Sequence, residues 1–209
     1  EKKQIVFVNN ETDRQQKFKT ILDGYYENLG ENLGETALIH KERSLTYQEF
    51  EEQTNQIARY LESTLKKDQN FIGLLMDKSI ELLLFIWGIM KSGRAYVPLE
   101  IEAPSGRLEN ILKQADCDYV ITQKNYAGKL GGVCEGAIDT EIISRSKTYS
   151  SCKLDVAPCG NGIAYVMFTS GTTGTPKGVQ IAHQSLANKS QWCPEELSLS
   201  RADVFIQKT

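Results

Sequence analysis

The residues with the clearest chemical potential lie in one ten-residue stretch, TSGTTGTPKG, at positions 169–178. Its three glycines let the backbone approach a ligand closely, because glycine has no side chain to keep the ligand away. Its four threonines and one serine add hydroxyl donors, and Lys177 adds one positive charge. Clustered backbone N–H groups, hydroxyls and a cation are the groups that bind a polyphosphate. The stretch therefore predicts a polyphosphate-binding loop.

The order of residues in this stretch excludes two common nucleotide-binding loops. A Walker A loop has lysine directly after glycine and Ser or Thr directly after the lysine, whereas Pro176 precedes Lys177 here and Gly178 follows it. The glycine spacing also does not fit G-x-G-x-x-G, which disfavours a dinucleotide-binding fold. The alternative is a flexible surface loop made of ordinary turn residues. We favour the binding loop because it directly follows a predicted buried strand, residues 163–168.

The elements that must position this loop follow from the apolar spacing along the chain. The pattern predicts helices over residues 14–29, 47–65, 80–91, 105–115 and 183–192, and strands over residues 36–40, 71–76, 95–97, 119–122, 163–168, 179–181 and 204–206. Residues 128–162 have a poor signal and predict an irregular stretch with two short strands at most. Thr46 and Glu49 form a capping-box pair, Ser79 and Ser105 are candidate helix caps, and Gly93 is a helix stop.

Alternating strands and helices predict an α/β fold, with a largely parallel sheet and helices on both faces. Such sheets bind ligands in crevices beyond the carboxyl ends of their strands. The loop after residue 168 is at such an end, so the predicted fold places it where a ligand is expected.

Composition narrows the function classes. The 209 residues carry a formal net charge of −3, so the chain has no excess of cations for binding nucleic acid. The longest strongly apolar run, residues 82–90, has nine residues, against about 20 for a membrane span, and predicts a buried helix.

The five cysteines are odd in number and lack C-x-x-C spacing, which predicts reduced thiols in a cytoplasmic protein. We expect them to be small buried side chains. Only His40 and His183 could add imidazole ligands, so we expect no zinc or other metal site, and we expect His183 to be structural.

Four stretches together resemble one known family. Residues 165–178 are similar to the phosphate-binding signature of the AMP-forming adenylate enzymes, which include acyl-CoA ligases, luciferases and peptide-synthetase adenylation domains. Residues 44–50 and 90–100 resemble the first two conserved motifs of nonribosomal peptide synthetase adenylation domains, and residues 104–112, with Arg107, resemble the helix that follows. The chain departs from the usual pattern at Arg94, where glycine is common, and at Glu100 and Ala103.

The resemblance implies a division of the chain and a role for the loop. Residues 1–16 would be an interdomain linker. Residues 17–209 would be the N-terminal portion of an adenylation domain, the first subdomain of its N-terminal domain, ending before the substrate pocket and the catalytic lysine. The residues implied for binding the phosphates of ATP are Thr169, Ser170, Gly171, Thr172, Thr173, Gly174, Lys177 and Gly178. No catalytic residue is implied within these 209 residues, so we expect them to be inactive alone.

The implied activity is an ATP- and Mg²⁺-dependent ligase reaction. An amino-acid carboxylate would be activated as its adenylate and then passed to the phosphopantetheine thiol of a carrier protein domain, with a condensation domain upstream. One alternative is a stand-alone acyl- or aryl-CoA ligase or a D-alanine–carrier protein ligase. A second, of a different class, is a non-catalytic binding piece.

Overall fold

The computed structural model describes residues 15–132, 134–155, 158–169, 176–200 and 202–207. Its elements in chain order are α1 (Ile21–Leu29), η2 (Gly30–Asn32), β1 (Thr36–His40), β2 (Arg43–Thr46), α2 (Tyr47–Thr64), β3 (Phe71–Leu75), α3 (Ile80–Lys91), β4 (Ala95–Pro98), α4 (Ser105–Gln114), β5 (Tyr119–Thr122), η3 (Ala127–Leu130), β6 (Glu135–Ile138), α5 (Asp139–Ser146), β7 (Ile163–Thr169), β8 (Lys177–Ala182) and α6 (His183–Glu196).

The centre of the molecule is a six-stranded sheet with strand order β6-β5-β3-β4-β7-β8. All neighbouring strands are parallel except β8, which is antiparallel to β7. Strands β1 and β2 form a separate antiparallel hairpin. The predicted α/β fold with a largely parallel sheet is confirmed.

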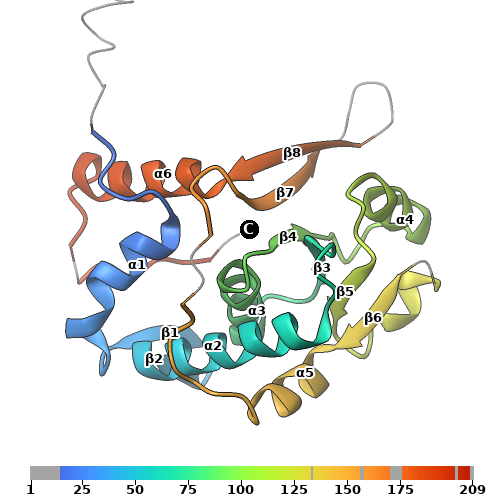
Figure 1. The fold of residues 1–209 in the computed structure, drawn as a ribbon, viewed down its shortest axis with the longest axis horizontal. Helices are drawn as coiled ribbons and strands as arrows, with labels where there is room; N and C mark the ends of the chain where they lie inside the picture. Colours follow the sequence, from blue (N-terminus) through green and yellow to red (C-terminus); the bar gives the residue numbers. More distant parts are fainter. Residues whose placement is uncertain (1–14, 133, 156–157, 170–175, 201, 208–209) are drawn as a thin grey trace, which may run out of the picture.

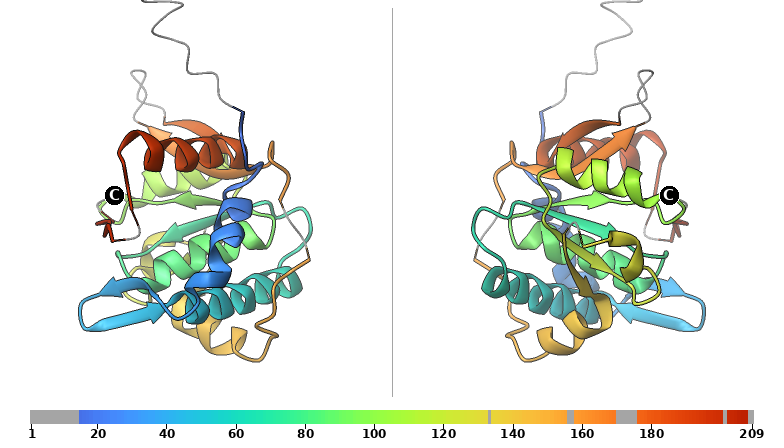
Figure 2. Two further views of the ribbon diagram at one scale, coloured as in Figure 1. Left: turned by 90° about the vertical axis from the view of Figure 1, so that its left-hand side faces the viewer. Right: turned by 90° about the vertical axis from the view of Figure 1, so that its right-hand side faces the viewer.

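Helices cover both faces of this sheet (Figures 1 and 2). On one face α2, α3 and α5 pack over β3 and β5, around fully buried residues such as Leu61, Phe85 and Ile121. On the other face α4 packs against β3, β4 and β5 through Leu108 and Leu112. The apolar run of residues 82–90 lies in α3 within this core, as predicted.

Helices α2 and α3 approach each other closely at Gly88. A Cβ atom added there would lie 2.5 Å from Cγ2 of Ile57, which is far inside van der Waals contact. Glycine at this position therefore sets the spacing of the two helices.

Local signals placed most helix ends correctly. Thr46 and Glu49 form the predicted capping box at the start of α2, and Ser79 Oγ accepts a hydrogen bond from Leu82 N at 3.1 Å at the start of α3. Gly93 follows α3 with a positive φ of 75°. The predicted Ser105 cap is wrong, because Pro104 is the N-cap of α4 and no side chain caps it.

Several predicted boundaries are also wrong. The first helix begins at Ile21, with Thr20 as its cap, and not at residue 14. Helix α5 and strand β2 were not predicted, because α5 is polar and short with Ile142 as its one buried large apolar residue, and β2 is mostly polar. Residues 204–206 are exposed and form no strand, so the predicted last strand is wrong.

Arg94, where the chain departs from the family pattern, closes the loop between α2 and β3. Its Nε donates to the carbonyl of Gln69 at 3.0 Å, and Nη2 donates to that of Lys66 at 3.4 Å. Nη1 donates to the carbonyl of Ser92 at the end of α3, at 3.3 Å. The side chain therefore ties the end of one helix to a neighbouring loop, which explains how an arginine is tolerated here.

The cysteines are free thiols, but they are not uniformly buried. Cys117 is buried as predicted, and burial raises the pKa of its thiol to about 12. Cys152 and Cys159 are exposed, so the expectation of small buried side chains is wrong for these two. Both lie in the stretch between α5 and β7.

Two further expectations concern the ends and surroundings of the chain. Of the predicted linker, residues 1–14 lie outside the described residues, and Gln16 Nε2 donates to the carbonyl of Gln184 on α6 at 2.9 Å.

No helix in the described part of the chain has both the length and the apolar character to cross a membrane.

Candidate phosphate-binding site

The candidate loop lies at the end of the hairpin formed by β7 and β8 (Figure 1). Strand β7 is built from β-branched, aromatic and small apolar residues, with Ala164 and Val166 buried. It runs parallel to β4, so its last residue, Thr169, lies at the carboxyl edge of the sheet. This is the edge at which α/β sheets bind ligands, and the predicted location is confirmed.

The register of the hairpin places Thr169 directly opposite Lys177. Residues opposite each other in an antiparallel pair project from the same face of the sheet. The Thr169 hydroxyl and the Lys177 ammonium are therefore neighbours on one face, one at each end of the candidate loop. Both residues are exposed, so they are open to a ligand.

Lys177 is not engaged within the described part of the protein, where no carboxylate forms an ion pair with it. Its charge is therefore available to an anion. The remaining predicted contacts, Ser170, Gly171, Thr172, Thr173 and Gly174, lie outside the described residues, and their roles stay predictions.

Gly178 has a packing role that sequence reasoning missed. It lies opposite Phe168 on the other face of the hairpin. A Cβ atom added to Gly178 would lie 3.0 Å from Cζ of Phe168 and 3.2 Å from Cγ1 of Val166. The Phe168 ring therefore lies directly over the glycine backbone, and a side chain at position 178 would displace it.

A groove of about 260 Å³ opens on the Phe168 face of the hairpin, towards the C-terminal end of α4. It is lined by Phe71, Gln114, Ala115, Asp116, Val166, Phe168, Gly178 and Gln180. The groove and the Lys177 side chain thus lie on opposite faces of the hairpin, so the groove does not extend the phosphate site.

Aromatic side chains attach β7 to the rest of the sheet. Tyr165 is paired with Tyr96 of β4, and their rings stack with centroids 5.3 Å apart. Burial, and next the neighbouring Tyr165, raises the pKa of Tyr96 to about 12. Tyr96 therefore stays neutral at physiological pH.

The same carboxyl edge carries a polar cluster that sequence reasoning did not single out. Tyr126 Oη donates to Asp77 Oδ2 at 2.9 Å, and Asp77 N donates to Gln123 Oε1 at 3.0 Å. The hydrogen bond to Asp77 raises the pKa of Tyr126. These residues directly follow β3 and β5, and that position after a buried strand was the available signal. Because they bond to one another, they tie two loops together.

His183 is buried, as a structural histidine would be, but its Nδ1 has no hydrogen-bond partner among the described residues. It begins α6 at the end of β8 remote from Lys177. It is 1% exposed, and burial lowers its pKa. Its backbone N–H donates to the carbonyl of Gly162 at 2.9 Å, which joins α6 to the turn before β7.

The carboxyl edge of the sheet and the candidate loop after β7 are typical of nucleotide-binding α/β proteins. Residues 26–209 match the family model described as "AMP-binding enzyme". The chain belongs to the AMP-binding enzyme family.

Named relatives include two synthases, zwittermicin A synthase ZmaJ and gramicidin S synthase 1. The chain is 34% identical to zwittermicin A synthase ZmaJ of Bacillus cereus, over 84% of this chain and 33% of that protein. It is 31% identical to gramicidin S synthase 1 of Brevibacillus brevis, over 97% of this chain and 19% of that protein. The chain thus spans a third or less of these two relatives.

Solved structures share the fold. The Klebsiella oxytoca NpsA N-terminal subdomain superimposes with a TM-score of 0.71 at 26% identity, over 83% of this chain and 44% of that chain. The nonribosomal peptide synthetase FmoA3, in an AMPPNP-bound form, superimposes with a TM-score of 0.82 at 23% identity, over 93% of this chain and 20% of that chain. The second likeness concerns the fold alone.

Proposed function

We propose that this chain is the phosphate-binding part of an ATP-dependent, AMP-forming ligase that activates an amino-acid carboxylate. The observation that carries the proposal is the end of the β7–β8 hairpin, where Thr169 and Lys177 face each other at the carboxyl edge of the sheet. Membership of the AMP-binding enzyme family supports ATP as the polyphosphate.

In the proposed reaction the substrate carboxylate attacks the α-phosphorus of ATP and pyrophosphate leaves. The chain contributes by binding and charge stabilisation rather than by a covalent step. Lys177 would offset the charge that develops on the leaving pyrophosphate, and Ser170, Thr172 and Thr173 would donate hydroxyl hydrogen bonds. Backbone N–H groups at Gly171 and Gly174 would complete the cradle.

ATP would enter as its magnesium complex. Mg²⁺ prefers phosphate, carboxylate and water oxygens, and the part of the chain that the structure describes holds no cluster of three or more candidate metal ligands. The phosphate oxygens of the nucleotide are therefore the natural ligands of the ion on this side of the site, and it would spread the same charge that Lys177 offsets.

The named relatives favour a place in nonribosomal peptide synthesis. The activated amino acid would pass to the phosphopantetheine thiol of a carrier domain, and a condensation domain would precede this chain. A stand-alone ligase that makes a CoA thioester is the second candidate, because it uses the same adenylation chemistry. Transfer assays with carrier protein and with CoA distinguish the two.

The test is amino-acid-dependent exchange of pyrophosphate into ATP by the full-length protein, with and without Lys177→Ala. A charge-assisted hydrogen bond is worth about 1.5–3 kcal/mol. We expect the lower half of this range, a loss of roughly 10- to 40-fold, because hydroxyls, backbone and Mg²⁺ share the phosphate charge. The KM for ATP should rise, while the KM for the amino acid and thioester transfer from preformed adenylate should change little.

The matched control is Lys113→Ala, which removes an exposed lysine that is paired with Glu109 on α4. It should leave exchange unchanged. Absence of exchange with every amino acid and carboxylic acid in the wild-type protein would overturn the proposed function. Wild-type exchange in Lys177→Ala, or equal losses in both half-reactions, would remove the phosphate role of Lys177.

A further inference from the structure

Strand β7 is reached by a long crossover. Strand β6 lies at one edge of the sheet, and β7 lies beyond β5, β3 and β4. The chain leaves α5, runs along α2 and then turns back to β7 (Figure 1). We call residues 149–153, the part of this crossover that lies against α2, the crossover strap.

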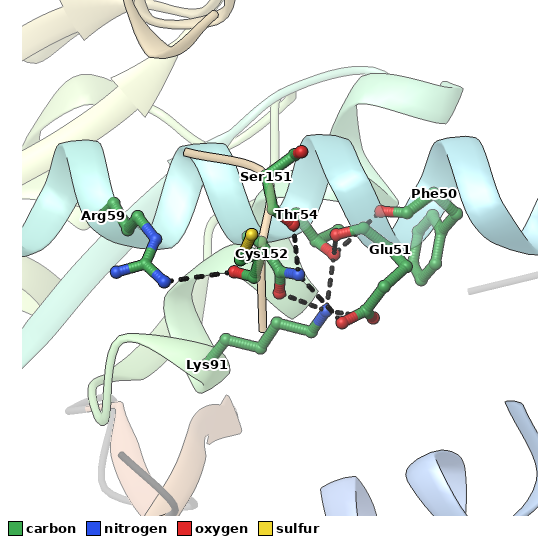
Figure 3. Close-up of polar contacts among 8 residues, drawn as sticks. Phe50, Glu51, Thr54, Arg59, Lys91, Ser151 and Cys152 are labelled. Carbon is green, nitrogen blue, oxygen red and sulfur yellow. Dashed lines mark hydrogen bonds and ion pairs between the residues drawn. The ribbon is translucent and has the colours of Figure 1, made fainter. Parts of the chain in front are cut away.

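Side chains of α2 hold the backbone carbonyls of the crossover strap. Asn55 Nδ2 donates to the carbonyl of Ser151 at 2.8 Å. Arg59 Nη2 donates to the carbonyls of Cys152 at 3.1 Å and Lys153 at 3.2 Å (Figure 3). The three acceptors are all backbone carbonyls. These contacts therefore hold the path of the backbone, whichever side chains the crossover strap carries.

The Asn55 amide is itself held by a buried charge. Lys91 of α3 is 1% exposed, and its ammonium donates to Asn55 Oδ1 at 2.9 Å, Thr54 Oγ1 at 2.8 Å and Glu51 Oε2 at 2.5 Å. Asn55 Nδ2 also donates to Glu51 Oε1 at 2.9 Å. With Oδ1 held by Lys91, Nδ2 must point to Glu51 and Ser151, as Figure 3 shows.

The attachment of β7 to the parallel sheet is short. Among the described residues its register with β4 is the pair Tyr96 and Tyr165 alone. Strand β3, in contrast, is paired with β4 from Phe71 to Leu74. Ala164 and Val166 also hold β7 through their buried side chains, and the crossover strap, which leads to β7 along the chain, adds a further constraint on the position of the strand.

We infer that Asn55 is a positioning residue: oriented by Lys91, it fixes the crossover strap and through it the strand that carries the candidate phosphate loop. Arg59, one helical turn further along α2, acts on the same strap. This inference concerns the placement of β7. One of its readouts, the KM for ATP, rests on the proposed function, and the others do not.

The test variant is Asn55→Asp in the full-length protein. Aspartate keeps an oxygen for Lys91, but it cannot donate to the Ser151 carbonyl or to Glu51 Oε1, and it adds a second carboxylate beside Glu51. Trypsin cleavage after Lys153 should become at least about tenfold faster, because the hydrogen bond that holds the crossover strap is lost and the local opening equilibrium shifts. Hydrogen exchange of the β7 amides should also accelerate, while that of the β3 amides stays unchanged.

The matched control is Asn28→Asp. Asn28 is exposed, and its Nδ2 donates to the carbonyl of Gly24 at 2.8 Å within α1. It is the same isosteric change and the same loss of a donor to a carbonyl, away from the crossover strap. It should leave trypsin cleavage after Lys153 and the hydrogen exchange of the β7 and β3 amides at wild-type values.

If Asn55→Asp does not fold, Arg59→Ala tests the same inference without disturbing the Lys91 network, and the same rise in cleavage and β7 exchange is expected. The KM for ATP should rise several-fold in either variant, with the KM for the amino acid unchanged. Wild-type cleavage after Lys153, or equal acceleration of β7 and β3 exchange, would overturn the inference. Faster β7 exchange in a protein without ATP exchange activity would support the inference while the proposed function fails.

Discussion

Two lysines of this protein do opposite things with the same charge. Lys177, at the end of the β7–β8 hairpin, is exposed and has no ion-pair partner in the part of the chain that the structure describes. Lys91, between α2 and α3, is 1% exposed and touches Glu51, Thr54 and Asn55. The first is free to meet a ligand, and the second is fully occupied by the protein.

The comparison shows that burial distinguishes a lysine that is open to a ligand from a lysine that stabilises the fold. An exposed ammonium has almost no desolvation cost, because water solvates it when no ligand is bound. A buried ammonium must find its partners within the fold, because an unpaired charge there is very costly. The Lys91 network meets this requirement, and it also raises the cost of any single change within it.

The largest expected effect comes from breaking the buried network on one side. Lys91→Met should lower the free energy of unfolding by about 3–5 kcal/mol, because Glu51 is left without its cation. Adding Glu51→Leu should restore most of the loss, because no uncompensated charge then remains. Urea unfolding followed by circular dichroism measures both variants. A double variant no more stable than Lys91→Met would show that the carboxylate is not the source of the loss.

The pH dependence sharpens the same comparison. Burial lowers the pKa of Lys91 to about 8, although the Glu51 carboxylate acts to raise it. Between pH 8 and the unfolded pKa of about 10.4, the unfolded chain holds a proton that the folded protein lacks. The contribution of Lys91 to stability should therefore rise with pH across this window, by at most about 1.4 kcal/mol per pH unit.

The control for this pH effect is the Lys91→Met/Glu51→Leu double variant, because tyrosines also titrate near pH 10. Subtracting its unfolding curve from that of the wild type isolates the network. A difference that falls between pH 8 and 10 would contradict the assigned direction of the Lys91 pKa.

Glycine replacements compare the packing of the two regions. Gly88→Ala should destabilise the protein by about 1–2 kcal/mol, because overpacking against Ile57 outweighs the better helix propensity of alanine. Gly178→Ala should cost less than about 1 kcal/mol, because Phe168 is not fully buried and can move. Thermal unfolding measures both. A larger loss at Gly178 than at Gly88 would show that the hairpin is the more tightly packed region.

The smallest expected effect is that of Lys177→Ala on stability. Removing an exposed side chain without a described partner should change the free energy of unfolding by less than about 0.5 kcal/mol, while ATP–pyrophosphate exchange falls as proposed above. A loss of several kcal/mol would place Lys177 within the supporting structure and not at the ligand.

Local signals account for what was predicted correctly. The capping box of Thr46 and Glu49, the helix stop at Gly93 and the apolar strand before Thr169 each act within a few residues. The glycine- and threonine-rich stretch is local as well, so the sequence alone was sufficient to place the candidate loop after a buried strand and to indicate the family. The roles of its central residues stay predictions.

Contacts between distant residues account for the rest. Glu51 and Lys91 are both charged and distant in sequence, and only the packing of α2 on α3 makes them a buried pair. The three carbonyl contacts of Arg94, the Phe168 ring over Gly178 and the hold of Asn55 on Ser151 likewise depend on which elements the fold brings together.

The sequence by itself determined the alternation of elements, the loop and the family, because turns, caps and apolar periods are properties of neighbouring residues. The tertiary structure alone decided which lysine is buried and which is exposed. Burial depends on the layers that cover a side chain, and no local pattern encodes these layers. The charge of Lys91 thereby belongs to the core, and that of Lys177 lies at the surface.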